Sequence, residues 1–238
     1  MQRRTALGAL ASMALAACGG GGGGGGQIVA ATTPQPQASA FAASGSIAAW
    51  GDSHTTGLPG RPDVPGYAAL LGQIAGGRQV FTGGAAGLTS TQIANLQVND
   101  AAHDDWVNVF WYGGNNQTDA ETIKADLARS IASLAPGNQR FLVLGVVNQA
   151  APAERRGGAD YDTIVRLNAD LAAQYGERFV DIREFLVGLA DPGNPADVVD
   201  RQDDVPPTSL RVDGIHLNEA GSTAVARKVL ELITAKGW

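Results

Sequence analysis

The sequence predicts an α/β fold, a three-layer α/β/α sandwich with a five-stranded parallel sheet. From about residue 46 onward, short runs rich in β-branched and aromatic residues alternate with segments whose apolar residues recur at helical spacing. The 238-residue chain is 44% hydrophobic, which is enough to bury the core of one domain. Strands that alternate with helices form parallel sheets covered on both faces, and sites form where such strands end.

Five apolar runs are expected to form the strands. They share β-branched and aromatic content and are bounded by Gly or Asn. The runs cover residues 46–50, 79–81, 106–112, 140–147 and 178–182. Functional residues are therefore expected in the loops that follow these runs.

The clearest helix lies between the third and fourth strands. Thr118 is expected to cap its start, and Pro136 and Gly137 to end it. Its apolar stripe consists of Ile123, Leu127, Ile131 and Leu134. Similar stripes predict a helix that ends at Gly176 and a last helix entered through Asn218.

The first 18 residues have the features of a signal peptide. The basic start MQRR precedes TALGALASMALAA, an apolar stretch too short to span a bilayer. It ends in Leu15-Ala16-Ala17-Cys18, which resembles the lipobox of bacterial lipoproteins, where the cysteine is diacylated. We therefore expect an exported protein anchored by lipid at Cys18 to the cell envelope, on the periplasmic side of a membrane or at the cell surface. The alternative is an ordinary signal peptide with a chance cysteine.

Residues 19–44 are expected to form a flexible tether. A glycine run reaches Gly26, and the segment after it is poor in charge and rich in Ala, Thr, Pro and Gln. The folded domain would then occupy residues 45–238. Because Cys18 is the only cysteine, we expect no disulfide in that domain.

Composition argues against two classes of partner. The net charge is −6, and the longest basic run is the pair Arg155-Arg156, expected in a solvated loop, so a nucleic-acid partner is disfavoured. No H-x-x-H, H-E-x-x-H or cysteine cluster occurs, so no metal or other cofactor is expected. Contact with a membrane is expected only through the lipid anchor, and the sequence does not indicate an oligomeric state.

Polar residues follow three of the predicted strands and precede the last helix. The four segments are Gly51-Asp52-Ser53, TGGAAG at 82–87, Gly113-Gly114-Asn115-Asn116 and Asp213-Gly214-Ile215-His216. The first is not the G-x-S-x-G elbow of α/β-hydrolases, because Thr55 stands where the second glycine would be.

Together these segments resemble the four sequence blocks of the GDSL or SGNH hydrolase superfamily. The matched residues are Ser53, Gly84, Asn115, Asp213 and His216. The resemblance covers roughly residues 46–236. Three positions depart from the usual family pattern: His54 replaces Leu or Ile, Thr82 replaces Asn, and Asn116 replaces Asp.

The resemblance implies a serine esterase with a flavodoxin-like fold. Ser53 would be the nucleophile, His216 the base and Asp213 the carboxylate that holds the imidazole. The Ser53 amide, the Gly84 amide and the Asn115 side chain would form the oxyanion hole. The substrate would be an acetyl or short-acyl ester of a carbohydrate or lipid, cleaved through an acyl-enzyme. Two alternatives are O-acyl transfer onto an envelope glycan and non-catalytic glycan or lipid binding by a lipoprotein on the same fold.

Each assignment has a structural alternative. Ser53 could cap a helix, Gly84 could serve a tight turn, and Asn115 could be a turn residue. Asp213 and His216 could be a helix-capping pair.

The other two histidines have different expectations. His103 is expected in a solvated loop. His54 is adjacent to Ser53, but neighbouring side chains diverge from the backbone, so His216 is the better candidate for the base.

Overall fold

The computed structural model of the protein describes residues 45–238. The predicted signal peptide, Cys18 and the tether lie outside these residues. The strands are β1 (Ile47–Gly51), β4 (Val80–Gly84), β5 (Val107–Trp111), β6 (Phe141–Leu144) and β7 (Phe179–Val180). They form one parallel sheet in the order β4-β1-β5-β6-β7, which confirms the predicted fold class and has flavodoxin-like topology.

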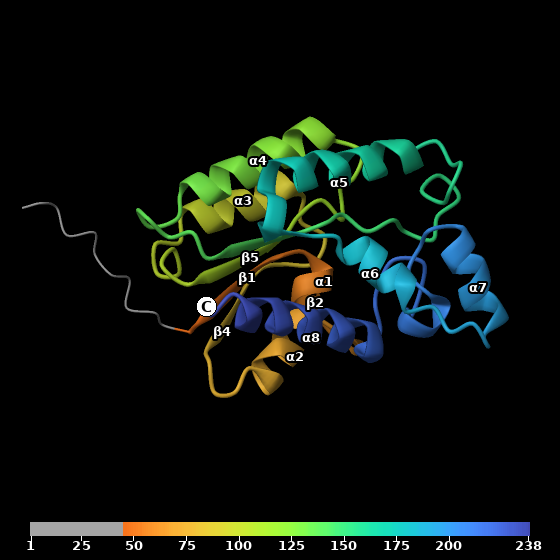
Figure 1. Ribbon diagram of the computed structural model, residues 1–238, viewed down its shortest axis with the longest axis horizontal. Coiled ribbons are helices and arrows are strands. Elements are labelled where there is room, and N and C mark those ends of the chain that lie inside the picture. The colour runs from red at the N-terminus through yellow and green to blue at the C-terminus, as the bar shows by residue number, and fades with distance from the viewer. Residues whose placement is uncertain (1–44) are drawn as a thin grey trace, which may run out of the picture. The chain divides into compact units, whose positions relative to one another are not determined.

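Helices cover both faces of this sheet (Figure 1). On one face lie α3 (Ser90–Val98), α4 (Ala120–Ala132) and α5 (Tyr161–Tyr175). On the other lie α2 (Tyr67–Ile74), α6 (Ile182–Gly188) and α8 (Glu219–Ala235). Successive strand residues point to opposite faces, so Ile47 and Ala49 pack in one core while Ala48 and Trp50 pack in the other. The sheet therefore separates two apolar layers.

The predicted boundaries of α5 and α8 agree with the structure, but both ends of α4 differ from the prediction. α4 ends at Ala132, with Ser133 as its C-cap, before the predicted stop at Pro136 and Gly137. Its N-cap is Asp119, whose carbonyl accepts the Ile123 N–H at 3.1 Å, so the prediction of Thr118 was wrong by one residue. The predicted cap of α8 is confirmed, because Asn218 Oδ1 accepts from the Gly221 N–H at 3.0 Å. The predicted end of α5 is confirmed by Gly176, which has a φ of 53°.

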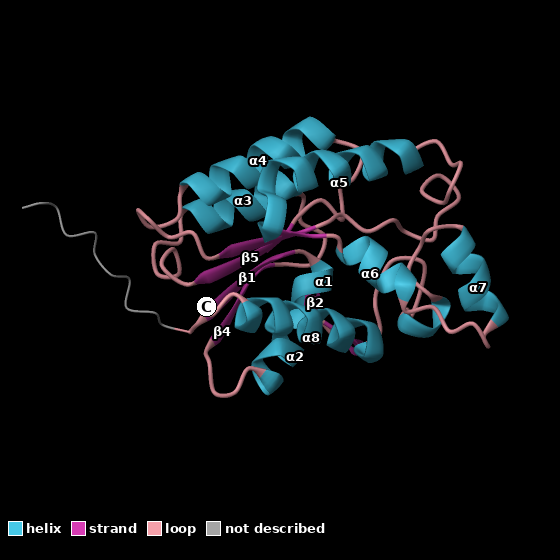
Figure 2. Cartoon of the chain, in the orientation of Figure 1, coloured by secondary structure: helices cyan, strands magenta, loops and turns pink. Residues whose placement is uncertain are grey.

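Several short elements complete the sheet edge where the candidate site lies (Figure 2). The turn after β1 forms α1 (Ser53–Thr56), followed by the hairpin of β2 (Gly57–Leu58) and β3 (Arg61–Pro65). At the opposite edge, where the parallel strands begin, a 3₁₀ turn, η1 (Gly176–Arg178), leads into β7. Between α6 and α8 lie α7 (Pro195–Gln202) and the 3₁₀ turn η2 (Thr208–Leu210).

No helix within residues 45–238 has the length and apolar character needed to cross a membrane.

Replacing Leu127 by alanine should destabilise the fold by about 2–5 kcal/mol, because its side chain on α4 is 1% exposed and truncation leaves a cavity. Leu96→Ala on α3 is the matched control. Leu96 is 50% exposed, so its loss should cost no more than about 0.5 kcal/mol. Urea unfolding followed by circular dichroism measures both, and equal losses would contradict the assigned core.

Candidate active site

Ser53 lies directly after β1, as the first residue of α1. The N-cap of α1 is Asp52, whose Oδ1 accepts the His54 N–H at 3.1 Å. The alternative that Ser53 caps this helix is therefore wrong. Ser53 is 6% exposed, and within residues 45–238 its hydroxyl makes no hydrogen bond. The hydroxyl is thus uncommitted at the end of a central strand.

Gly84 ends β4 and is in register with Gly51 of β1. Its φ is 109°, and a Cβ there would lie 1.9 Å from the Gly51 carbonyl oxygen. A Cβ at Gly83 would lie 2.2 Å from Cε3 of Trp50. Close packing alone thus requires glycine at both positions, and the structure places the Gly84 backbone beside the turn that carries Ser53.

Asn115 follows β5, the other neighbour of β1. Its Nδ2 donates to the Leu88 carbonyl at 3.0 Å and, weakly, to Asp52 Oδ2 at 3.4 Å. The side chain is therefore next to the Ser53 turn, but its amide hydrogens are directed at these two acceptors. Asn116 points elsewhere and bonds the Ser90 amide at the start of α3 at 3.0 Å.

Asp52 links the Ser53 and Asn115 loops. It is 3% exposed, and burial raises the pKa of its carboxyl group, while the charge of His54 and the N–H groups of His54 and Gly114 act in the opposite direction. A Cβ at Gly114 would lie 2.4 Å from Asp52 Oδ2. Asp52 therefore connects the loop that carries Ser53 with the loop that carries Asn115.

Asp213 and His216 contact each other directly. His216 Nδ1 lies 3.0 Å from Asp213 Oδ2, and the backbone N–H groups of His216 and Ile215 donate to Asp213 Oδ1 at 2.7 and 2.8 Å. Burial acts to raise the pKa of Asp213, but these hydrogen bonds outweigh it and lower the pKa to about 2. Because Asn218 caps α8, Asp213 and His216 are not its capping pair. A carboxylate thus orients the imidazole.

His54 lies between the two halves of the site. Its ring stacks on Trp111 at a centroid distance of 4.9 Å and lies 6.2 Å from the ring of His216. Burial lowers the pKa of His54, as does the neighbouring His216, while Asp52 and Asp213 oppose the shift. The His54 ring therefore lies between the buried ring of Trp111, which is 4% exposed, and the ring of His216.

The segment after β6 bridges both halves, which the sequence analysis did not predict. Gln149 Nε2 donates to the Gly114 carbonyl at 3.1 Å, and the Ala150 N–H donates to the Gly214 carbonyl at 2.7 Å. Glu154, 5% exposed, accepts from the Gln149 N–H at 2.7 Å. Position after a strand was the only sequence signal for this segment.

Three residues expected in solvated loops have partners. His103 bonds Asp100 at 2.8 Å and stacks on Phe81 at 3.8 Å. Arg155 pairs with Asp203 at 2.8 Å, and Arg156 with Asp204 at 3.5 Å. All three lie in loops, as expected. Arg156 is 59% exposed, whereas His103 and Arg155, at 17% and 35%, are only partly solvated because they pack against neighbouring loops. In the described part of the chain, no group of three or more His, Cys, Asp or Glu side chains could hold a metal ion.

Solved structures similar to this fold include lipolytic proteins and esterases. A lipolytic protein of the G-D-S-L family from Desulfitobacterium hafniense DCB-2 superposes with a TM-score of 0.59 at 15% identity, covering 79% of this chain and 99% of that one. The chain has the fold of the G-D-S-L lipolytic proteins. This G-D-S-L fold is also seen in a GDSL-like lipase from Bacteroides thetaiotaomicron VPI-5482, with a TM-score of 0.58, 17% identity, and coverage of 81% and 89%. An acetyl xylan esterase has a TM-score of 0.58 at 18% identity, with coverage of 78% and 98%.

Sequence comparison is less extensive. No protein-family model matches the chain. The tail spike protein of Salmonella phage epsilon15 is 26% identical in an alignment of 149 residues that covers 57% of this chain. The match spans 14% of the length of that protein.

The partly buried imidazole of His54 should make stability depend on pH. Its pKa in the folded protein is below the ordinary value of 6.5, so the neutral form is favoured more strongly in the folded than in the unfolded state. The resulting stabilisation is present above about pH 6.5 and is lost as the pH falls through the folded pKa. His54→Leu should therefore flatten the fall in unfolding free energy over this window. Urea titrations at several pH values measure it, and an unchanged slope would refute the assignment.

Proposed function

We propose that the chain is a serine esterase that hydrolyses carboxylic esters through a triad of Ser53, His216 and Asp213. The observation that carries this proposal is the 3.0 Å contact between His216 Nδ1 and Asp213 Oδ2. The His216 ring lies 6.2 Å from the ring of His54, which is the residue after Ser53. A carboxylate on Nδ1 leaves Nε2 available as the base for a serine. The fold shared with solved lipolytic and esterase structures supports the same reaction class.

In the proposed mechanism, Ser53 Oγ attacks the ester carbonyl carbon as its proton moves to His216 Nε2. The imidazolium formed is stabilised by Asp213, whose low pKa keeps it ionised at neutral pH. The proton then passes to the departing alcohol, and an acyl-enzyme remains. Water, losing a proton to the same imidazole, attacks this intermediate and releases the acid.

The tetrahedral intermediate places negative charge on the former carbonyl oxygen. We assign its donors as the N–H groups of Ser53 and Gly84 and the side-chain amide of Asn115. For Asn115 this requires one amide hydrogen to turn from Leu88 or Asp52 toward the substrate, and its bond to Asp52, at 3.4 Å, is the weaker. Loss of one such donor typically slows the reaction about 10²- to 10³-fold. The hydroxyl of Ser53 makes no hydrogen bond to His216 in the described residues, and catalytic hydrogen bonds often tighten only when substrate binds.

Acetyl and other short-acyl esters of a carbohydrate or lipid are the proposed substrates. The acetyl xylan esterase of similar fold makes acetylated sugars the first group to test. A panel of p-nitrophenyl esters of increasing chain length, together with acetylated oligosaccharides, would rank these classes by kcat/KM.

Residues 45–238 should hydrolyse p-nitrophenyl acetate and react with a fluorophosphonate probe. Ser53→Ala should abolish both, because the nucleophile is lost. His216→Ala should lower kcat by about 10⁴-fold or more, whereas the matched variant His54→Leu should retain most of the wild-type rate. Equal losses in the two histidine variants would reverse the assignment of the base, and a wild-type chain that neither turns over nor labels would refute the esterase.

The exported, lipid-anchored state is a separate proposal, supported by Leu15-Ala16-Ala17-Cys18 at the end of the apolar leader. Such an enzyme would meet esters of the cell envelope or of the surroundings. In a bacterial host fed labelled palmitate, the full chain should be labelled and recovered with membranes. Cys18→Ser should lose the label and leave the membrane fraction, and unchanged fractionation would contradict the anchor.

A further inference from the structure

The turn that carries Asp213 and His216 has little packing of its own. Asp213, Gly214 and Ile215 are all exposed, and Ile215 retains 42% of its accessible surface. A single antiparallel bridge, Arg211 with Leu217, closes its base, together with the bond from the Val212 N–H to the His216 carbonyl at 3.0 Å. Such a turn needs contacts from outside to hold an imidazole in one orientation.

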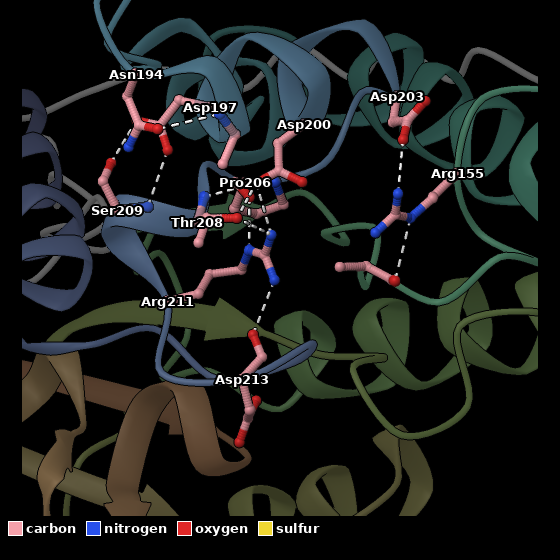
Figure 3. A network of polar contacts seen from close by, with 12 residues as sticks. Arg155, Asn194, Asp197, Asp200, Asp203, Pro206, Thr208, Ser209, Arg211 and Asp213 are labelled. Carbon is pink, nitrogen blue, oxygen red and sulfur yellow. Dashed lines mark hydrogen bonds and ion pairs between the residues drawn. The ribbon is translucent and has the colours of Figure 1, made fainter.

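Arg211 supplies a contact of that kind (Figure 3). Its Nη1 donates to the Asp213 carbonyl oxygen at 2.9 Å. The other guanidinium donors are engaged beneath the turn, Nε with the Pro206 carbonyl at 2.6 Å and Nη2 with Asp200 Oδ2 at 2.7 Å. The planar fork of the guanidinium thereby joins the backbone of Asp213 to two fixed acceptors.

The fixed acceptors belong to the segment formed by α7 and η2. The Arg211 and Asp200 side chains are only 8% and 6% exposed, so their ion pair is shielded from solvent. Asp200 also accepts the Thr208 N–H at 2.6 Å, and Asp197, one turn earlier on α7, accepts the Ser209 N–H at 3.0 Å. Two buried carboxylates of one helix thus hold η2, from which Arg211 and the turn continue.

We propose that Arg211, anchored by Asp200, is a positioning residue that holds the Asp213–His216 turn in its catalytic orientation. Arg211 touches no reacting group and acts through the Asp213 backbone. Because Asp213 bonds both the ring and the backbone of His216, a shift of its carbonyl moves the carboxylate and the imidazole together. This inference rests on the proposed function, in which His216 is the base.

Arg211→Lys is the variant of choice, since it keeps the positive charge beside Asp200. A single ammonium group cannot reach the Asp213 carbonyl while replacing both lower contacts. Activity is measured with p-nitrophenyl acetate, and kcat is calculated per active site titrated with fluorophosphonate. We expect kcat to fall about ten-fold or more with little change in KM, because small displacements of catalytic groups slow the reaction strongly. Arg183→Lys is the matched control. Arg183 pairs with Asp204, also in a poorly exposed site, but does not contact the turn.

A second measurement does not depend on turnover. In protein labelled with ¹⁵N-histidine, the Nδ1 proton of His216 held by Asp213 should give a far-downfield, slowly exchanging NMR signal. Arg211→Lys should lose this signal or speed its exchange by about ten-fold, consistent with freer opening of the turn, and Arg183→Lys should keep it. Should Arg211→Lys fail to fold, Asp200→Asn carries the same test, since it weakens the anchor and leaves the guanidinium in place.

The outcomes separate the two proposals. An unchanged Nδ1 signal and unchanged kcat per titrated site in Arg211→Lys, with only a lower melting temperature, would show a purely structural role and overturn the inference. If the wild-type chain hydrolyses no ester, the proposed function fails, and the NMR comparison alone decides whether Arg211 orients His216.

Discussion

The close packing of three parallel strand ends determines where the candidate site lies. Gly51 at the end of β1 is in register with Gly84 of β4 on one side and Trp111 of β5 on the other. A Cβ at Gly51 would lie 2.1 Å from Thr55 Oγ1. Neighbouring strands are about 4.8 Å apart, so the loops after β4 and β5 both leave the sheet beside the loop after β1. This places a nucleophile, a glycine backbone and an amide side chain at one edge of the sheet.

Charge is distributed so that each half of the site has one carboxylate with a distinct environment. Asp52 is buried and its pKa is raised, while Asp213 is half-exposed and receives enough hydrogen bonds to lower its pKa to about 2. Asp52 accordingly braces backbone and amide groups, and Asp213 supports an imidazole that gains positive charge. The environments, and not the residue type, assign the two roles.

Apolar periodicity predicted the strands and the long helices, because these elements bury one stripe or both faces in the two cores. The start of α4 was misplaced by one residue because Thr118 and Asp119 both have side chains suited to a cap. α7 was missed for a different reason: its buried face carries Asp197 and Asp200, so no apolar stripe marks it.

The candidate site was predictable where its geometry is local. Asp213 and His216 are three residues apart, so their pairing follows from spacing. The direction of the Asn115 amide depends on the Leu88 loop, which is distant in the sequence, and the orientation of the Arg211 guanidinium depends on Asp200 of α7. The spacing of the sequence motifs therefore predicts neither of these two orientations.

The buried carboxylates of α7 affect how the site can unfold locally. Ser53 follows a central strand that is hydrogen-bonded on both sides, whereas the turn that carries His216 is held by the Arg211 side chain, which is anchored to Asp200 of α7. Segments held in this way open locally at lower free-energy cost than a sheet does. Local opening of the Asp213–His216 turn would therefore take the imidazole away from Ser53 while the five strands stay paired.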